Sequence, residues 1–296
     1  HVLSLPLVDS KAIREAGFRV AIDCVNSVGG IILPQLLERL GVDYVEKLYC
    51  EPTGIFQHNP EPLEKNLGDI MQLMRKKELD VAFVVDPDVD RLAMICEDGT
   101  MYGEEYTLVT VADYVLKNTP GNTVSNLSST RALRDVTDKY GMKYYASAVG
   151  EVNVVAKMKE THAVIGGEGN GGVIYPPAHY GRDALVGIAL FLSHLAHEGK
   201  KVSELRASYP TYYMAKNRID LTPDTDIDAI LEKVKEVYRN EEVNDIDGVK
   251  IDFADGWVHL RKSNTEPIIR VYSEARTADE ADRLAKTVCA IACEKN

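Results

Sequence analysis

The chain has 296 residues, of which 45% are apolar and 27% are charged, a composition typical of a folded protein with two or three domains. Asp and Glu number 46 against 34 Lys and Arg, which gives a net charge of −12 at pH 7. This balance excludes non-specific nucleic-acid binding, which depends on a basic surface. The longest apolar stretch, from Ala184, is too short to span a bilayer, so no membrane partner is expected. Five scattered cysteines indicate a reduced, cytoplasmic protein.

Short strands alternate with amphipathic helices over the first two hundred residues, which is typical of α/β domains. The first cycle predicts a strand at 18–25, a helix at 31–41, a strand at 43–49, a helix at 62–80, a strand at 81–86 and a strand with its turn at 91–99. A second cycle follows and closes with an apolar helix at 183–198. We therefore predict one α/β domain at 1–103 and another at 104–207, both with mixed sheets.

The last ninety residues follow a different pattern. Asp255-Gly256 is a strong hairpin-turn signal between two strand-like runs, and a final helix opens with the capping box Thr277…Glu280. These features predict an α+β domain at 208–296 with an antiparallel sheet.

Three aspartates follow the apolar run VAFVV two residues apart: Asp86, Asp88 and Asp90. Because Pro87 disfavours a helix, we expect an extended loop whose alternate side chains converge on one cation. An EF-hand is excluded, since Arg91 occupies the sixth loop position, where the sharp turn needs glycine. A solvated acidic turn is the alternative, but the regular spacing favours a metal, and Mg²⁺ fits best.

Two further loops combine polar groups with an unusual backbone or charge. GGEGNGG (166–172) presents Glu168 and Asn170 on glycines, which suits sugar hydroxyls, although a glycine-rich hairpin is the plainer alternative. RKSNTEPIIR (261–270) suits a phosphate or, equally, a solvated basic turn. Its candidate phosphate ligands are Arg261, Ser263, Asn264, Thr265 and Arg270. FQHNPEPL (56–63) lacks a serine before His58, so it is not predicted to be catalytic.

FQHNPEPL aside, the other three loops, in their order along the chain, resemble the α-D-phosphohexomutase family of phosphoglucomutases, phosphomannomutases and phosphoglucosamine mutases. DPDVDR resembles the metal loop of the family, GEGNGG its sugar-recognition loop and RKSNTEP its phosphate loop. The resemblance covers the chain as the second to fourth domains of the family, and the first domain, with its Ser-His-Asn-Pro phosphoserine loop, has no counterpart here. Gly172 stands where the sugar loop often has His. The acid–base residue therefore stays open, and Arg91 is the only catalytic candidate.

The resemblance implies an enzyme that interconverts hexose 1-phosphate and hexose 6-phosphate, with glucose, mannose or glucosamine as the sugar, through a phosphoserine and a bisphosphorylated intermediate. Mg²⁺ would then be bound by the three aspartates and by the phosphoserine. We expect the missing N-terminal domain to complete the site and this chain alone to be inactive. Two alternatives stay open: a non-catalytic phosphosugar-binding protein, and a metal-dependent phosphatase with Asp86 as nucleophile.

Overall fold

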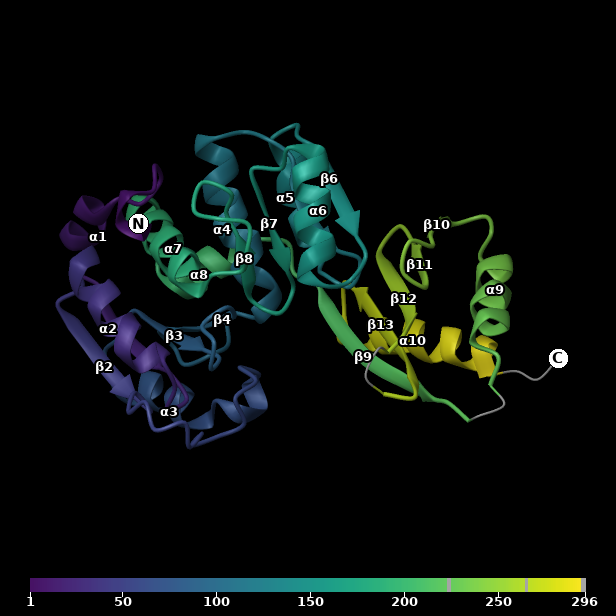
Figure 1. Ribbon diagram of the computed structural model, residues 1–296, viewed down its shortest axis with the longest axis horizontal. Helices are drawn as coiled ribbons and strands as arrows, with labels where there is room; N and C mark the ends of the chain where they lie inside the picture. Colours follow the sequence, from purple (N-terminus) through teal and green to yellow (C-terminus); the bar gives the residue numbers. More distant parts are fainter. Residues whose placement is uncertain (223–224, 264–265, 294–296) are drawn as a thin grey trace. The chain divides into compact units, whose positions relative to one another are not determined.

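A computed structural model describes residues 1–222, 225–263 and 266–293. The chain forms two compact units (Figure 1). Unit 1 comprises residues 1–126, 132–146 and 150–210. Unit 2 comprises residues 127–131, 147–149 and the described residues from 211 onward. The predicted boundary at residue 103 lies inside unit 1, and the three-domain division stays a prediction.

The first sheet of unit 1 has the strand order β2-β1-β3-β4. Its strands are β1 (Arg19–Asp23), β2 (Tyr44–Leu48), β3 (Val81–Val85) and β4 (Leu92–Cys96). Both β2 and β3 run parallel to β1, whereas β4 runs antiparallel to β3. All residues of β3 and β4 are buried, as expected for unbroken apolar strands that are covered on both faces.

Helices follow the strands of this sheet and supply much of its core. They are the 3₁₀ helix Val2–Ser4, α1 (Ser10–Ala16), α2 (Gly29–Leu40), the 3₁₀ helix Glu64–Asn66 and α3 (Gly68–Lys76). The helix predicted at 62–80 is thus much shorter, because the segment with Pro60 and Pro62 forms a loop and a 3₁₀ turn first. Ile70 and Met74 of α3 pack on Ala82 and Val84 of β3.

The second sheet of unit 1 has the order β6-β5-β7-β8 and is also mixed, since β7 is parallel to β5 and antiparallel to β8. Its strands are β5 (Thr123–Asn126), β6 (Tyr144–Ser147), β7 (Ile165–Glu168) and β8 (Gly172–Ile174). The helices are α4 (Glu104–Asn118), α5 (Ala132–Lys139), α6 (Glu151–Thr161), α7 (Ala184–Glu198) and α8 (Val202–Ala207). The apolar helices α4 and α7 pack against each other, and both contact β4 and β8 (Figure 1).

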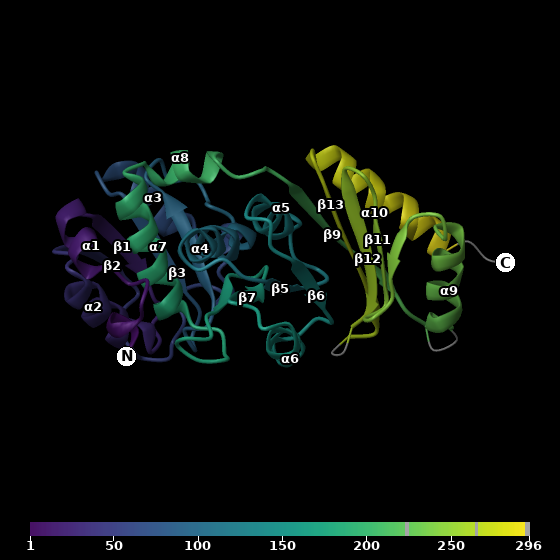
Figure 2. The same cartoon turned by 90° about the horizontal axis from the view of Figure 1, so that it is seen from above.

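Unit 2 contains an antiparallel sheet with the order β10-β11-β12-β13-β9. Its elements are β9 (Tyr213–Asp220), α9 (Ile227–Val237), β10 (Glu242–Asn244), β11 (Val249–Asp252), β12 (Gly256–Lys262), β13 (Ile268–Ala275) and α10 (Ala278–Cys293). Helices α9 and α10 cover the same face of this sheet (Figure 2) and share one apolar core with it.

The predicted fold class is confirmed: mixed α/β sheets are followed by an antiparallel α+β domain. The Asp255-Gly256 turn joins β11 to β12, with the Phe253 N–H donating to the Gly256 carbonyl over 2.8 Å. The Glu280 N–H donates to the Thr277 hydroxyl over 3.2 Å, which confirms half of the predicted capping box.

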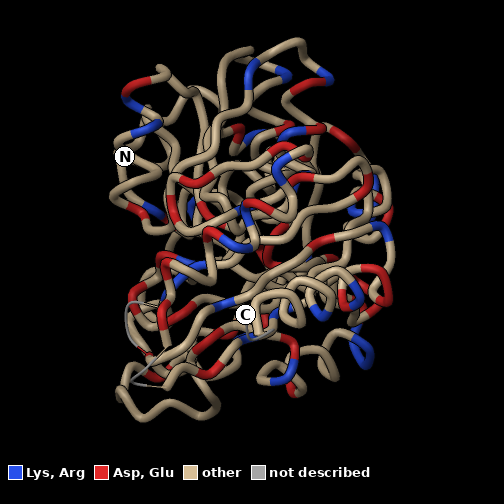
Figure 3. Tube along the Cα trace, turned by 90° about the vertical axis from the view of Figure 1, so that its right-hand side faces the viewer, with Lys and Arg blue, Asp and Glu red and all other residues tan. Residues whose placement is uncertain are grey.

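Basic and acidic residues are interspersed along the described trace (Figure 3). The overall negative charge of the chain is therefore not concentrated in one segment. Of the helices that the structure describes, none is both long enough and apolar enough to cross a membrane.

Candidate functional site

The aspartate loop begins where β3 ends. The Asp86 carboxylate turns back over the following residues, and its Oδ1 accepts the backbone N–H groups of Asp90 (3.1 Å) and Arg91 (3.0 Å). The Val89 N–H also donates to the Asp86 carbonyl, and Val89 has a left-handed φ of 61°, which is strained for a β-branched residue. The loop is therefore a tight turn, and the predicted extended conformation is wrong. A carboxylate that caps its own turn outweighs the extended preference around Pro87.

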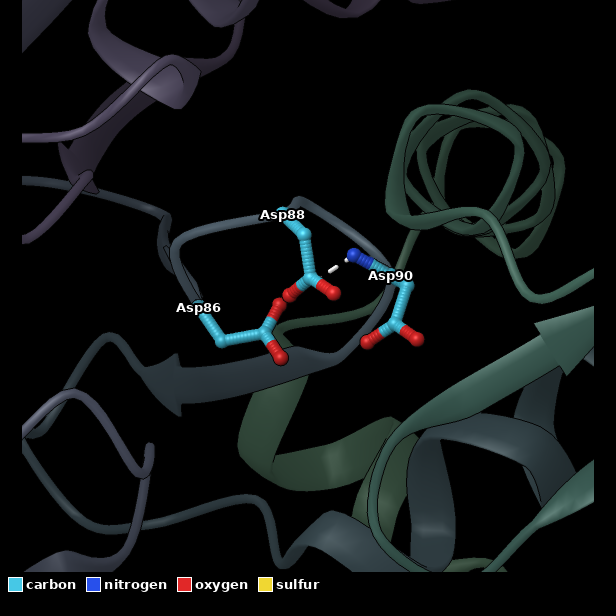
Figure 4. A group of neighbouring side chains, drawn as sticks. All are labelled: Asp86, Asp88 and Asp90. Carbon is cyan, nitrogen blue, oxygen red and sulfur yellow. Dashed lines mark hydrogen bonds between the residues drawn. The ribbon is translucent and has the colours of Figure 1, made fainter. Parts of the chain in front are cut away.

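The side chains of Asp86, Asp88 and Asp90 nevertheless point toward one another (Figure 4), with one oxygen of each within 4.8 Å of the others. The pKa of Asp86 is raised to about 7, chiefly by burial, against the backbone hydrogen bond from Arg91 and with help from the neighbouring carboxylates of Asp90 and Asp88. Three converging carboxylate oxygens are the kind of ligand set that a hard cation such as Mg²⁺ prefers.

Arg91 lies beside the aspartates. Its Nε is 3.5 Å from Asp86 Oδ2 and 3.9 Å from Asp90 Oδ1, and it is buried with no hydrogen-bond partner among the described residues. Glu97, which would be the last ligand of an EF-hand, accepts the backbone N–H of Ser203 at 3.1 Å instead. The geometry thus agrees with the exclusion of an EF-hand.

The glycine-rich loop is the hairpin between β7 and β8, in which Glu168 pairs with Gly172. Glu168 is buried, and its Oε1 accepts hydrogen bonds from Asn126 Nδ2 (2.8 Å) and the Gly150 N–H (3.2 Å). Asn170 turns its side-chain carbonyl to the Gly172 N–H at 3.2 Å. The loop is therefore a glycine-rich hairpin, as in the plainer alternative, and this hairpin also carries the polar side chains of Glu168 and Asn170.

This hairpin touches the aspartate turn within unit 1. The Leu92 N–H donates to the Gly171 carbonyl over 3.1 Å. Gly171 has a φ of 89°, and a Cβ there would lie 2.4 Å from the Leu92 carbonyl oxygen. Only glycine allows so close an approach, so the metal-loop and sugar-loop candidates are in direct contact.

Arg182, which the sequence did not reveal as a site residue, joins the two loops. Its Nη1 donates to Glu168 Oε2 (2.9 Å), its Nε donates to Glu151 Oε2 (2.9 Å), and its Nη2 donates to Asp90 Oδ2. Asp183 caps α7 by accepting the N–H groups of the helix start, which fixes the residue before it. In the sequence, the one signal that could have pointed to Arg182 is its place directly before an aspartate that caps a helix.

The phosphate-loop candidates lie in unit 2, at the ends of β12 and β13. Arg261 is directly opposite Arg270, and Arg270 is opposite Arg218 of β9, so three arginines form a row on one face. Like charges so placed repel each other. Arg261 Nε is buried and has no hydrogen-bond partner among the described residues, whereas Arg270 Nη2 donates to Glu266 over 2.7 Å. The sequence did not reveal Arg218, because sheet register cannot be read from it.

The other predicted members of this loop are less informative. The Ser263 hydroxyl is buried and accepts the Glu266 N–H at 3.3 Å, which closes the loop itself. Asn264 and Thr265 lie outside the described residues.

Comparison with protein families accounts for nearly the whole chain. Residues 1–99 match the phosphoglucomutase/phosphomannomutase alpha/beta/alpha domain II, residues 103–213 match domain III, and residues 219–291 match the C-terminal domain. The chain belongs to the phosphoglucomutase/phosphomannomutase family. The matches comprise domains II, III and IV of this family, without domain I.

Curated members of the phosphoglucomutase/phosphomannomutase family include a phosphoglucomutase/phosphomannomutase of Thermococcus kodakarensis. It is 37% identical over 278 residues, covering 93% of this chain and 60% of the relative. A probable phosphoglucosamine mutase of Methanopyrus kandleri is 30% identical over 284 residues, covering 94% of this chain and 62% of the relative. The chain thus spans about three fifths of the length of these relatives.

Two solved structures share the fold. A phosphoglucomutase/phosphomannomutase family protein of Burkholderia thailandensis superimposes with a TM-score of 0.81 at 25% identity, covering 98% of this chain and 66% of that protein. An N-acetylphosphoglucosamine mutase of Aspergillus fumigatus, solved with GlcNAc-6P and magnesium, superimposes with a TM-score of 0.66 at 16% identity, covering 96% of this chain and 70% of that protein. The second match shows the fold alone.

One polar pair of this family member lies outside the three loops. His58 Nε2 is 3.1 Å from Asp23 Oδ2, and Asp23 is buried at the end of β1. Burial raises the pKa of Asp23, while the Val25 N–H and His58 lower it. The pair anchors the loop that contains FQHNPEPL to the sheet, which agrees with the prediction that this stretch is not catalytic.

Proposed function

We propose that this chain supplies the metal-binding, sugar-binding and phosphate-binding parts of a phosphohexomutase that interconverts hexose 1-phosphate and hexose 6-phosphate of glucose, mannose or glucosamine. The observation that carries the proposal is the convergence of Asp86, Asp88 and Asp90 on a turn that is hydrogen-bonded to the sugar-loop hairpin. Membership of the family supports the same reaction class.

Mg²⁺ would be held by the three aspartates, and when bound it would offset the negative charge of a transferring phosphoryl group. Arg91 lies beside these oxygens and is the candidate to contact that phosphoryl group. Glu168 and Asn170 would bind sugar hydroxyls, and Arg261 and Arg270 would bind the phosphate that is not being transferred. Ser263, Asn264 and Thr265 complete the proposed phosphate loop.

The nucleophile in this proposal is a phosphoserine outside these 296 residues, because the sequence contains no Ser-His-Asn-Pro loop. The phosphate would pass from that serine to the sugar, and the second phosphate of the bisphosphorylated intermediate would return to it. The geometry favours this over a phosphatase with Asp86 as nucleophile: Asp86 is 6% exposed, and its Oδ1 already accepts two backbone N–H groups.

The test is ³¹P NMR of glucose 1-phosphate with Mg²⁺ and a trace of glucose 1,6-bisphosphate. We expect no glucose 6-phosphate from this chain alone, and conversion by a chain extended upstream through a phosphoserine domain. Turnover by the 296 residues would contradict the missing nucleophile, and release of inorganic phosphate would favour the phosphatase. An extended chain that binds glucose 1-phosphate without converting it would favour the non-catalytic phosphosugar-binding protein.

A further inference from the structure

Arg182 has an unusual set of partners for a single side chain. It is 14% exposed, and its three donor nitrogens reach three different carboxylates: Asp90 of the metal loop, Glu168 of the sugar loop and Glu151 at the start of α6. Because the guanidinium is planar and rigid, it cannot turn without breaking at least one of these contacts. Arg182 therefore fixes the position of Asp90 relative to Glu168.

Gly172 makes room for this arginine. A Cβ at position 172 would lie 2.3 Å from Arg182 Cδ and 3.0 Å from its Cγ. Gly172 is not among the residues with a positive φ, so its backbone could accept a side chain. Arg182 makes the closest contact that a side chain there would meet, and Asn170 Oδ1, at 3.1 Å, is the next neighbour. The space beside Gly172 is thus filled by the side chain of Arg182, ten residues further along the chain.

The arginine beside Gly172 changes the chemistry of the loop. Burial lowers the pKa of Arg182, but Asp90, Glu168 and Glu151 outweigh this effect and raise it. A guanidinium in this setting is a permanent positive charge and cannot act as an acid or base near neutral pH. A permanent charge bonded to Asp90 also competes with a cation for that carboxylate.

We propose that Arg182 is a positioning residue of this site, which ties the metal loop to the sugar loop and holds down the affinity of the aspartates for a divalent cation. The inference rests on the proposed function, because it takes Asp86, Asp88 and Asp90 as the metal ligands. It assigns to this chain a permanently charged side chain against Gly172, between the metal loop and the sugar loop.

Mn²⁺ binding, followed by electron paramagnetic resonance, tests the charge directly on this chain. Arg182→Ala is expected to bind Mn²⁺ about tenfold more tightly, the effect of removing a unit charge at roughly 6 Å from the ion in a partly hydrated site. Arg182→Lys keeps the charge and is expected to stay within about threefold of wild type. Arg39→Ala removes an exposed arginine at the far end of α2 and is expected to change nothing.

A purely structural role predicts the opposite sign. If Arg182 only braces the loop, its loss would loosen Asp90 and weaken Mn²⁺ binding. Unchanged or weaker binding in Arg182→Ala therefore overturns the inference.

Gly172→Ala tests the packing without removing a charge. The added methyl group must displace Arg182, so we expect tighter Mn²⁺ binding and a melting temperature lower by a few degrees. In the Arg182→Ala background the same change is expected to have neither effect. Equal effects of Gly172→Ala in both backgrounds would contradict the proposed packing.

Failure of this inference and failure of the proposed function can be told apart. If neither wild type nor Arg182→Ala binds Mn²⁺, the inference about Arg182 fails, whereas the proposed function is decided separately, by the conversion of glucose 1-phosphate in the chain extended upstream. If wild type binds Mn²⁺ and Arg182→Ala binds it equally well, only the role of Arg182 is wrong.

Discussion

The acidic turn of unit 1 and the basic loop of unit 2 carry their charge in opposite ways. In unit 1 the chain itself compensates much of the charge: backbone N–H groups reach Asp86, and Arg182 binds Asp90. In unit 2 the arginines oppose one another across the strands, and Arg261 Nε has no hydrogen-bond partner among the described residues.

This difference has a physical consequence for binding. A cation that binds the acidic turn must compete with groups already in place, so its affinity is set by that competition. An anion that binds the basic loop removes repulsion and fills an unused donor, so each arginine should contribute separately. The acidic turn should therefore behave as one coupled unit, and the basic loop as a set of individual contacts.

Asp88→Asn should give the largest effect. Asp88 is exposed and makes no hydrogen bond among the residues that the structure describes, so its loss should remove one metal ligand without unfolding the loop. We expect Mn²⁺ affinity to fall about 100-fold, since even residues that only support metal ligands contribute 10- to 100-fold. Electron paramagnetic resonance measures this, with the exposed Asp43→Asn as the matched control. If Mn²⁺ affinity changes by less than about threefold, the three aspartates form a solvated acidic turn and not a metal site.

Arg261→Ala tests the basic loop. We expect the affinity for glucose 6-phosphate to fall about 30-fold, as for the loss of one charge-assisted hydrogen bond, with no change in Mn²⁺ affinity. Calorimetry with and without Mg²⁺ would show both, and Arg283→Ala, an exposed arginine on α10, serves as the control. Equal losses in both arginine variants would indicate a general charge effect.

His259 limits the pH range in which unit 2 can be tested. Burial lowers the pKa of His259 to about 4, while an exposed histidine titrates near 6.5. The unfolded chain therefore binds more protons between these values, so the stabilisation is complete above pH 6.5 and is lost as pH falls toward 4. We expect the unfolding free energy to fall by about 1.4 kcal/mol when the pH is lowered from 7.5 to 5.5, because of His259.

Denaturation followed by Trp257 fluorescence would measure this loss, because the only tryptophan is buried in unit 2. His259→Gln should lose about 1.4 kcal/mol less over the same pH range. An equal loss in both proteins would mean that His259 is not the group that titrates.

Arg218→Ala should give the smallest effect. Arg218 is exposed and is 3.3 Å from Asp220, so it should add only a screened charge to the arginine row. We expect a loss of about threefold in glucose 6-phosphate affinity that disappears at high salt. If Arg218→Ala loses as much glucose 6-phosphate affinity as Arg261→Ala, the anion binds to the row of three arginines and not to the loop at 261–270.

The sequence predicted those elements and loops that are determined by residues close together in the chain. The unbroken apolar run of β3, the Asp255-Gly256 turn and the Thr277 cap depend on neighbouring residues, and each formed as predicted. The aspartates also converge as predicted, although by a turn instead of an extended loop.

The long-range partners could not be predicted. Arg182 is 92 residues from Asp90, and the space above Gly172 depends on how the β7–β8 hairpin packs against α7. Arg218 meets Arg270 only through the register of β9 on β13. A single sequence does not specify such contacts, because many strand registers satisfy the same apolar pattern.

Anomalous diffraction from crystals of this chain soaked in Mn²⁺ is the most direct test of the central claim. We expect a single strong peak among Asp86, Asp88 and Asp90, at about 2.2 Å from one oxygen of each. A peak at other residues only, or no peak at a Mn²⁺ concentration that saturates the protein in solution, would contradict it.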